Sequence, residues 1–191
     1  MAEALPGDFF VRDVLEVAPA LLGARLIRRF NDTIVSGIIS EVEAYRGEED
    51  LACHARAGRT PRTAVMYGPP GHAYVYFTYG MHWMLNVVCM PAGEPAAVLL
   101  RAILPEAGLD QIAARRAGVA PAQWCNGPAK LCRALAIDGA FNACDLTDPR
   151  GGLWIEAGMT PPAESIHASA RIGIDNVPEP WKNKPWRFTF R

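Results

Sequence analysis

Hydrophobic residues recur along this chain at two spacings, one typical of strands and one typical of helices. Runs of alternating or continuous apolar residues, many of them β-branched or aromatic, predict strands. These runs lie at 24–30, 33–44, 74–78, 83–88, 96–104, 151–156 and 186–191. Apolar residues at helical spacing predict helices at 14–22, 105–117 and 127–137. The second helix has Arg in its last turn and the third has Pro near its start, which are common helix-end signals.

The order of these elements favours an α+β fold over a doubly wound sheet. Most strands are joined by hairpins or long loops, without regular crossover helices between them. No linker in the 191 residues is long enough to divide the chain, so we expect residues 1–191 to form a single domain. The sheet is expected to be mainly antiparallel, with the helices packed around it.

The segment YVYFTYGMHWMLNVV, at 74–88, predicts a hairpin with an unusual tip. Hairpin turns normally carry small polar residues, with glycine supplying a positive φ. Gly80 fits this rule, whereas Tyr79 and Met81 are large side chains that a tip would expose to water. The tip therefore indicates a function that a polar turn would not serve.

Composition narrows the class of protein. Half of the residues are hydrophobic, which is enough for a core, but no window approaches the ~20 apolar residues of a membrane span. The N-terminus lacks the basic region and apolar run of a signal peptide. Five cysteines, an odd number at spacings that match no zinc site, are expected to be reduced thiols in a cytoplasmic protein.

Charge is distributed unevenly, although the net charge is only −1. Three segments contain no Asp or Glu, namely 51–93, 111–137 and 180–191. They carry basic residues that include Arg59, Arg62 and Lys130. If these segments share a face, the protein has a positive side that could meet phosphates. Ordinary surface charge is the alternative, and clustering alone does not separate the two.

Three polar residues in predicted strands are candidates for chemistry. Arg101 interrupts AAVLLRAIL, where a guanidinium is costly unless it is paired with an anion or reaches water at the strand end. Glu43, in SEVEAYRG, could supply the anion, although alone it is more typical of a strand edge that faces solvent. Asn86, in WMLNVV, needs partners for two donors and an acceptor, on a ligand or on a loop.

Aromatic rings near these segments could stack on a planar ligand, although core packing is their commoner role. The rings belong to Tyr45, His54, Tyr74 and Tyr76. His72 and His82 lack the spacing of metal ligands, and GPPGH at 68–72 is a turn rather than a phosphate-binding loop. We therefore expect no metal and no cofactor.

Five blocks of residues, in order along the chain, resemble the alkyladenine (3-methyladenine) DNA glycosylase family. They are EVEAY at 41–45, GRTPR at 58–62, YVYFTYGMHWMLN at 74–86, VLLRA at 98–102 and NGPAKLC at 126–132. The resemblance extends from LPGDFF near the start to KPWRF near the end, and it is closest to a bacterial-type member. It implies one glycosylase domain with a curved sheet, surrounding helices and a protruding β-hairpin.

The resemblance implies a catalytic pair and a wedge. Glu43 matches the general base, and Arg101 matches the arginine that helps to hold the attacking water. Tyr79 matches the aromatic that enters the DNA minor groove and fills the space of a flipped nucleotide, with Met81 beside it.

The resemblance also implies a base pocket. Tyr45 and His54 match the two residues that sandwich the flipped base. Tyr76 matches a ring at the pocket edge, and Asn86 matches the carboxamide that screens bases by clashing with the amino group of guanine. Matching or candidate phosphate contacts are Arg59, Arg62 and Lys130. Because one pocket needs Tyr76 and Asn86 on one face, we predict a three-residue hairpin loop in which Tyr76 pairs with Met84 and Tyr74 with Asn86.

The implied activity is monofunctional base excision from double-stranded DNA by a protein that acts as a monomer. The substrates would be 3-methyladenine and 7-methylguanine, with hypoxanthine and ethenoadenine left open, and an abasic site would remain. Cutting the strand as well would need an amine for a Schiff base, and the chain has only three lysines. The main alternative is a non-catalytic damaged-DNA-binding module, with Glu43 turned away from the pocket. A small-molecule hydrolase is disfavoured by the wedge and by the acid-free segments.

Overall fold

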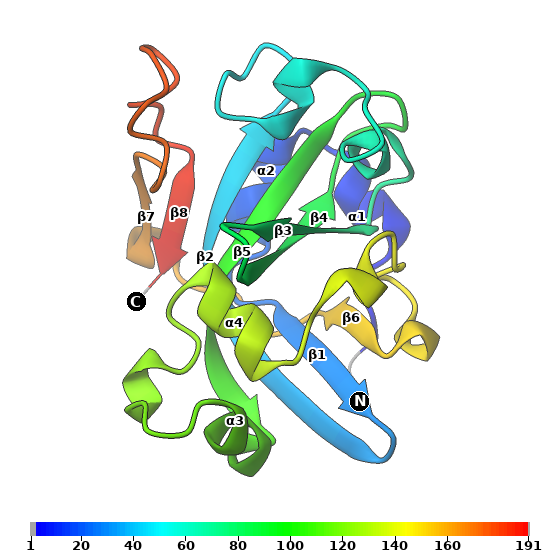
Figure 1. The fold of residues 1–191 in the computed structure, drawn as a ribbon, viewed down its shortest axis with the longest axis vertical. Coiled ribbons are helices and arrows are strands. Elements are labelled where there is room, and N and C mark those ends of the chain that lie inside the picture. Colours follow the sequence, from blue (N-terminus) through cyan, green and yellow to red (C-terminus); the bar gives the residue numbers. More distant parts are fainter. Residues whose placement is uncertain (1–2, 191) are drawn as a thin grey trace.

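The computed structural model describes residues 3–190, which form an open antiparallel sheet with helices on both faces (Figure 1). The eight strands of this part of the chain are β1 (Arg25–Phe30), β2 (Thr33–Arg46), β3 (Ala73–Thr78), β4 (His82–Val88), β5 (Ala96–Ala107), β6 (Leu153–Glu156), β7 (Ile166–Ser169) and β8 (Arg187–Phe190). Their order is β3-β4-β5-β2-β1-β6, and β8 pairs with β2 and with β7. The long strands β2 and β5 therefore form the centre of the sheet.

Four α-helices cover the sheet within the described residues. They are α1 (Gly7–Val11), α2 (Val14–Ala20), α3 (Leu109–Arg115) and α4 (Pro128–Ala134). Helix α2 packs against β2 and β5 behind the sheet in Figure 1, whereas α4 packs against β4 and β5 in front. Short 3-10 helices lie at His54–Ala57, Ala64–Tyr67, Pro121–Gln123, Gly139–Phe141, Pro149–Gly151 and Ala163–Ser165. No helix between residues 3 and 190 is long and apolar enough to cross a membrane.

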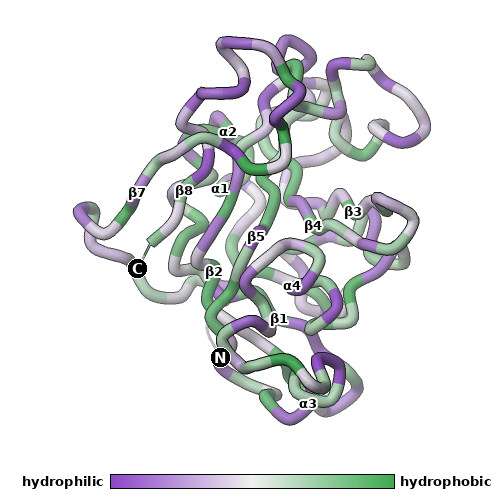
Figure 2. Tube along the Cα trace, turned by 60° about the vertical axis from the view of Figure 1, so that its left-hand side comes forward, coloured by the Kyte–Doolittle hydropathy of each residue, from purple (hydrophilic) through white to green (hydrophobic). Residues whose placement is uncertain are grey.

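The main hydrophobic core fills the space between the sheet and its helices. Figure 2 shows hydrophobic residues along β2 and β5 and hydrophilic stretches in the outer loops. On β2, Val42 and Ala44 are fully buried in this core. Because side chains alternate along a strand, Glu43 and Tyr45 point to the opposite face, where α4 lies.

The expected α+β fold with a mainly antiparallel sheet is confirmed, but one predicted helix begins too early. Residues 105–117 are not helical throughout, because β5 continues to Ala107 and pairs with β2 over Pro105 and Ala107. Gly108 then adopts a left-handed conformation, with φ +67°, and α3 begins after it. Helix α1, of 5 residues, and β7, of 4 residues, were not predicted because such short elements show no periodicity. Arg191, the last residue of the predicted strand 186–191, lies outside the described residues.

The hairpin of β3 and β4 has the predicted three-residue loop. The paired residues are Tyr74 with Asn86, Tyr76 with Met84 and Thr78 with His82. Tyr79 and Gly80 both have positive φ, +52° and +66°, and the N–H of Met81 donates to the carbonyl of Thr78. Tyr79 is 80% exposed and Met81 is 67% exposed, so both side chains project from the hairpin.

Candidate active site

A cavity of about 310 Å³ opens between the sheet, the hairpin and α4. It is lined by residues from several separate segments of the chain, among them Tyr45, His54, Tyr76, Tyr79, Asn86, Arg101, Pro128 and Ile172. The predicted base-pocket residues are thus brought together, although they are distant in sequence. Apolar side chains, including Met66 and Leu99, complete the lining and make it suitable for a flat, partly apolar ligand.

Glu43 lies directly behind this cavity and has no exposed surface. Its Oε1 accepts the backbone N–H of Ile172 at 2.7 Å, and its Oε2 accepts the hydroxyl of Tyr45 at 2.9 Å. Arg101 Nη1 lies 3.3 Å from the same Oε2. Glu43 itself does not line the cavity, but all three of its partners do. The strand edge facing solvent, which is the common place for such a glutamate, is therefore not where Glu43 lies.

Burial of Glu43 results from long-range pairing. Strand β8 adds to the second half of β2, where Glu43 pairs with Arg187, and the segment around Ile172 covers the carboxylate. A buried carboxylate is stable only with hydrogen-bond donors or cations around it, and here two hydrogen-bond donors and the Arg101 cation surround it. Glu43 lies next to the cavity, since all three of these partners line it, and its role as the catalytic base stays a prediction.

Arg101 is shared between two carboxylates rather than paired with Glu43 alone. Its Nε donates to Glu41 Oε1 at 2.8 Å, a shorter contact than the one to Glu43. Glu41 also accepts from Arg187 Nε at 2.7 Å. Burial would raise the pKa of Glu41, but the hydrogen bonds from Arg187 and Arg101 outweigh it and lower the pKa. Burial likewise would lower the pKa of Arg101, but the charges of Glu43 and Glu41 raise it.

An irregularity of the ladder explains how Arg101 reaches both carboxylates. Glu41 pairs with Ala102 and Val42 with Leu100, so Arg101 has no partner in the register. Such β-bulges bend a strand and re-aim side chains, and they are common beside active sites. Glu41 was missed by the sequence reasoning, although its place two residues before Glu43 on the same strand face was a usable signal.

Aromatic rings form one wall of the cavity. The rings of His54 and Tyr76 meet edge to face with centroids 4.6 Å apart, and His54 Nδ1 lies 2.9 Å from the hydroxyl of Tyr74. Burial, reinforced by the charges of Arg62 and Arg56, lowers the pKa of His54 to about 4. His54 is therefore neutral near pH 7. Burial is also the main cause that raises the pKa of Tyr76 to about 12.

Asn86 is buried on β4 and faces this cavity. Its Nδ2 donates to the carbonyl of Tyr74 at 2.9 Å, across the paired strand β3. This bond fixes the plane of the carboxamide. Asn86 thus holds the neighbouring strand, and its contact with a ligand in the cavity stays a prediction.

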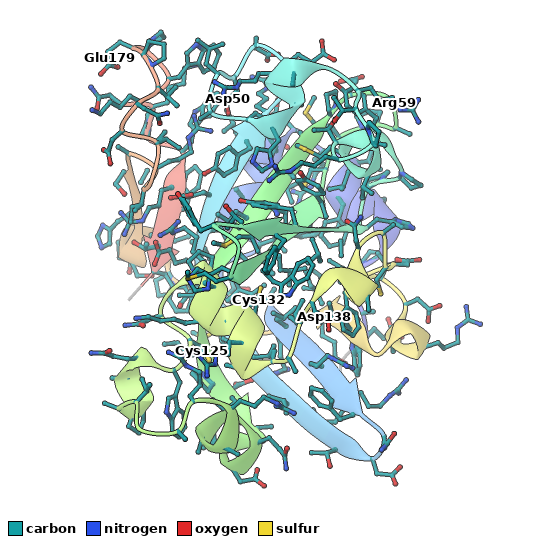
Figure 3. All side chains as sticks on the ribbon, in the orientation of Figure 1. Asp50, Arg59, Cys125, Cys132, Asp138 and Glu179 are labelled. Carbon is teal, nitrogen blue, oxygen red and sulfur yellow. The ribbon has the colours of Figure 1, made fainter. Side chains whose placement is uncertain are left out.

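Of the predicted phosphate contacts, Arg59 and Arg62 are exposed and Lys130 is half-buried. Arg59, labelled in Figure 3, lies over the ring of Tyr67, and Arg62 lies over the ring of Tyr76 at 5.2 Å. Lys130 belongs to α4, the helix that also supplies the lining residue Pro128, and its Nζ donates to Asn126 Oδ1 at 2.8 Å. Within residues 3–190, Arg59, Arg62 and Lys130 form no salt bridge, which leaves their charges available to an anion.

The described chain brings together no group of three or more His, Cys, Asp or Glu residues that could hold a metal ion. Among the lining residues that sequence reasoning missed are Ile172, Gly173 and Ile174, from the segment between β7 and β8. The contribution of Ile172 to Glu43 is a backbone N–H, which every residue but proline carries, so no side-chain pattern could have signalled it.

Comparison with known proteins gives a consistent result. The methylpurine-DNA glycosylase (MPG) family matches residues 8–191. A protein of Carboxydothermus hydrogenoformans, named provisionally as a 3-methyladenine DNA glycosylase, is 47% identical over 186 residues, which are 96% of this chain and 93% of that protein. Proteins of Burkholderia cenocepacia and Frankia casuarinae that carry the same name are each 46% identical, over 97% and 95% of this chain and 86% of each relative. This chain belongs to the methylpurine-DNA glycosylase family.

Proposed function

We propose that this DNA glycosylase flips alkylated purines out of duplex DNA into the cavity and hydrolyses their N-glycosidic bond with a water activated by Glu43. The observation that carries the proposal is the buried Glu43 carboxylate, held by two hydrogen-bond donors and the Arg101 cation directly behind an aromatic cavity. The names of the relatives support 3-methyladenine as one substrate. Excision of 7-methylguanine is part of the same proposal.

The attacking water needs a place at the carboxylate. Of the three contacts to Glu43, the one from Arg101 is the longest, at 3.3 Å, and Arg101 lines the cavity. We infer that the water takes this place, where it donates to Glu43 and accepts from Arg101. Catalytic contacts are often incomplete before the substrate binds, so the closed wall over Glu43 fits a general base that becomes accessible when DNA occupies the site.

The chemistry suits a lesion that is already cationic. A purine alkylated at N3 or N7 leaves without much acid assistance, and the sugar develops positive charge as the bond breaks. A carboxylate near C1′ favours that charge and accepts the proton of the attacking water. The neutral imidazole of His54 supports this assignment, because a cationic base would be repelled by an imidazolium. Tyr45, with its hydroxyl engaged by Glu43, supplies the facing ring.

DNA would approach from its minor-groove side, with the hairpin tip leading. Tyr79 is both exposed and part of the cavity lining. Its ring can therefore fill the gap that the flipped nucleotide leaves in the DNA base stack, while the flipped base enters the cavity beside it. Arg59, Arg62 and Lys130 would contact phosphates around the lesion. None of the three lysines lines the cavity, which supports hydrolysis without strand cleavage. Action as a monomer in the cytoplasm belongs to the same proposal, and the five free cysteines fit such a reducing compartment.

The test is base release from duplex DNA that contains 7-methylguanine or 3-methyladenine, under single-turnover conditions. The wild type should release the base, and Glu43→Gln should slow release by ~10²–10⁴ while retaining affinity for the lesion duplex. Glu106→Gln is the matched control, because Glu106 pairs with Arg25 and does not line the cavity. A wild type that binds the duplex and releases no base would favour the non-catalytic module instead.

A further inference from the structure

A second buried ion pair lies next to the active site, outside the groups used above. The side chains of Arg171 and Asp50 have no exposed surface. Arg171 Nη1 lies 2.5 Å from Asp50 Oδ2, and Nη2 lies 2.9 Å from Oδ1, so the pair is bidentate. Asp50, labelled in Figure 3, belongs to the loop after β2, and Arg171 belongs to the segment between β7 and β8. The pair therefore joins two segments that are far apart in sequence.

The guanidinium of Arg171 reaches beyond Asp50 to two more parts of the chain. Its Nη1 donates to the carbonyl of Ala44 at 2.9 Å, and its Nη2 donates to the carbonyl of Trp181 at 3.3 Å. It also lies 4.7 Å from the centroid of the Tyr45 ring. Arg171 is not part of the cavity lining, whereas Tyr45 is, so the guanidinium supports the ring from outside the cavity.

Asp50 organises the other side of the cavity. Its Oδ1 accepts the N–H of Ala52 at 3.0 Å, and its carbonyl accepts the N–H of Cys53 at 2.8 Å. These bonds fix the short loop that leads directly into His54. One ion pair thus contacts the segment of each residue that would sandwich the base, Tyr45 through its ring and His54 through its loop.

The residue after Arg171 supplies the donor to Glu43. Ile172 donates its N–H to Glu43 Oε1 at 2.7 Å, yet 49% of its surface is exposed. Burial of the Ile172 side chain therefore contributes little to holding this backbone in place. The fully buried side chain of Arg171 is the anchor next to it, so its position determines whether the N–H reaches the carboxylate.

A buried ion pair is a poor way to gain stability, since apolar residues of similar volume often serve as well. The pair instead fixes geometry, because the planar guanidinium of arginine holds several hydrogen-bond acceptors in defined positions at once. Here those acceptors are Asp50, Ala44 and Trp181.

We propose that the Asp50–Arg171 pair is the positioning device of the active site. It holds the Ile172 N–H on Glu43 and so orients the carboxylate toward the place of the attacking water. This proposal rests on the proposed function, in which Glu43 activates that water. Arg171 and Asp50 are positioning residues, because they act through Ile172, Tyr45 and Glu43 and do not touch the cavity.

Two variants test the proposal. Arg171→Lys keeps the charge and loses the fork. The double variant Asp50→Leu with Arg171→Met removes both charges, and so leaves no unpaired ion that would unfold the protein. Leu26→Ala is the control, because Leu26 is fully buried on β1 and does not line the cavity. Its melting temperature should fall as in other core truncations, without a change at Glu43.

Each variant is measured in three ways below its melting temperature. These are single-turnover release of 7-methylguanine, affinity for a duplex with a stable abasic analogue, and hydrogen-exchange protection of the Ile172 amide. We expect both pair variants to lose about 10²-fold in release rate, because a misplacement near 1 Å has that effect, with nearly unchanged affinity for the abasic duplex. Ile172 should lose protection in both, and Leu26→Ala should keep both its release rate and its Ile172 protection.

Pair variants with the wild-type release rate and a protected Ile172 amide would overturn the proposal. A release rate that falls equally in Leu26→Ala would overturn it too, because the loss would then follow stability. If the wild type releases no base, the proposed function fails, but protection of Ile172 in the wild type and its loss in the pair variants still test the positioning on their own.

Discussion

Tyr79 sits in a backbone conformation that suits its neighbour Gly80 better than itself. Its φ is +52°, in the left-handed region that asparagine and glycine adopt more readily. A non-glycine residue there costs about 1–2 kcal/mol. The side chain is 80% exposed, so it regains little of this by burial. Strain held at an exposed tip supports the hypothesis that Tyr79 has a functional role, which a substitution can test.

The substitution Tyr79→Asn should therefore change stability and DNA binding in opposite directions. Asparagine tolerates the left-handed conformation, so the free energy of unfolding should rise by up to about 1 kcal/mol. In a chain of this size that corresponds to a melting temperature roughly 2–4 °C higher. Loss of the aromatic wedge should remove about 1–3 kcal/mol of stacking, which weakens binding to the lesion duplex about 5- to 150-fold.

Urea denaturation measures the first effect, and fluorescence anisotropy with a duplex containing an abasic analogue measures the second. Asn31 offers a matched control, because it has φ +50° in the turn between β1 and β2 and does not line the cavity. Asn31→Tyr should lower the free energy of unfolding by about 1 kcal/mol and leave DNA affinity unchanged. If Tyr79→Asn destabilises the protein and binds DNA like the wild type, Tyr79 is a structural residue and the wedge assignment is wrong.

Three further results are expected. The pKa of His54 is lowered to about 4 in the folded state. Below pH ~6.5 the imidazole is therefore protonated in the unfolded state while it is still neutral in the folded state. Stability should then fall by up to about 3 kcal/mol as pH drops from 6.5 toward 4, and an NMR titration that gives His54 an ordinary pKa would contradict this. Affinity for undamaged duplex DNA should fall steeply as the salt concentration rises. Arg59→Ala and Arg62→Ala should each reduce the slope of log K against log salt by about 1. A flat salt response in the wild type would mean that the basic segments do not form one face. Burial raises the pKa of Cys53 and Cys132 to about 12. Maleimide should therefore label the half-buried Cys144 first in the native protein, as measured by mass spectrometry of peptides. Earlier labelling of another cysteine would contradict this expectation.

The sequence alone determined what depends on local periodicity. Strand segments followed from their apolar runs, and the fold class followed from how those runs are joined. The pattern alone left two hairpin registers open, and the family resemblance, which puts Tyr76 and Asn86 in one pocket, selected between them because side chains alternate strictly along strands. The structure confirms this pairing. The end of β5 escaped prediction, because Pro105 and Ala107 look helical by local pattern and only pairing with β2 makes them extended.

Tertiary structure alone decided the environment of Glu43, the candidate general base. Nothing local distinguishes Glu43 from a solvent-facing glutamate, and it is buried because β8 and Ile172 reach it from more than a hundred residues away. The same holds for Glu41, whose carboxylate receives two arginines from distant strands. Such contacts depend on packing and on backbone donors. The pattern of side-chain types along the chain predicts which segments form strands. It does not predict which distant segment will cover and bury a given charged side chain.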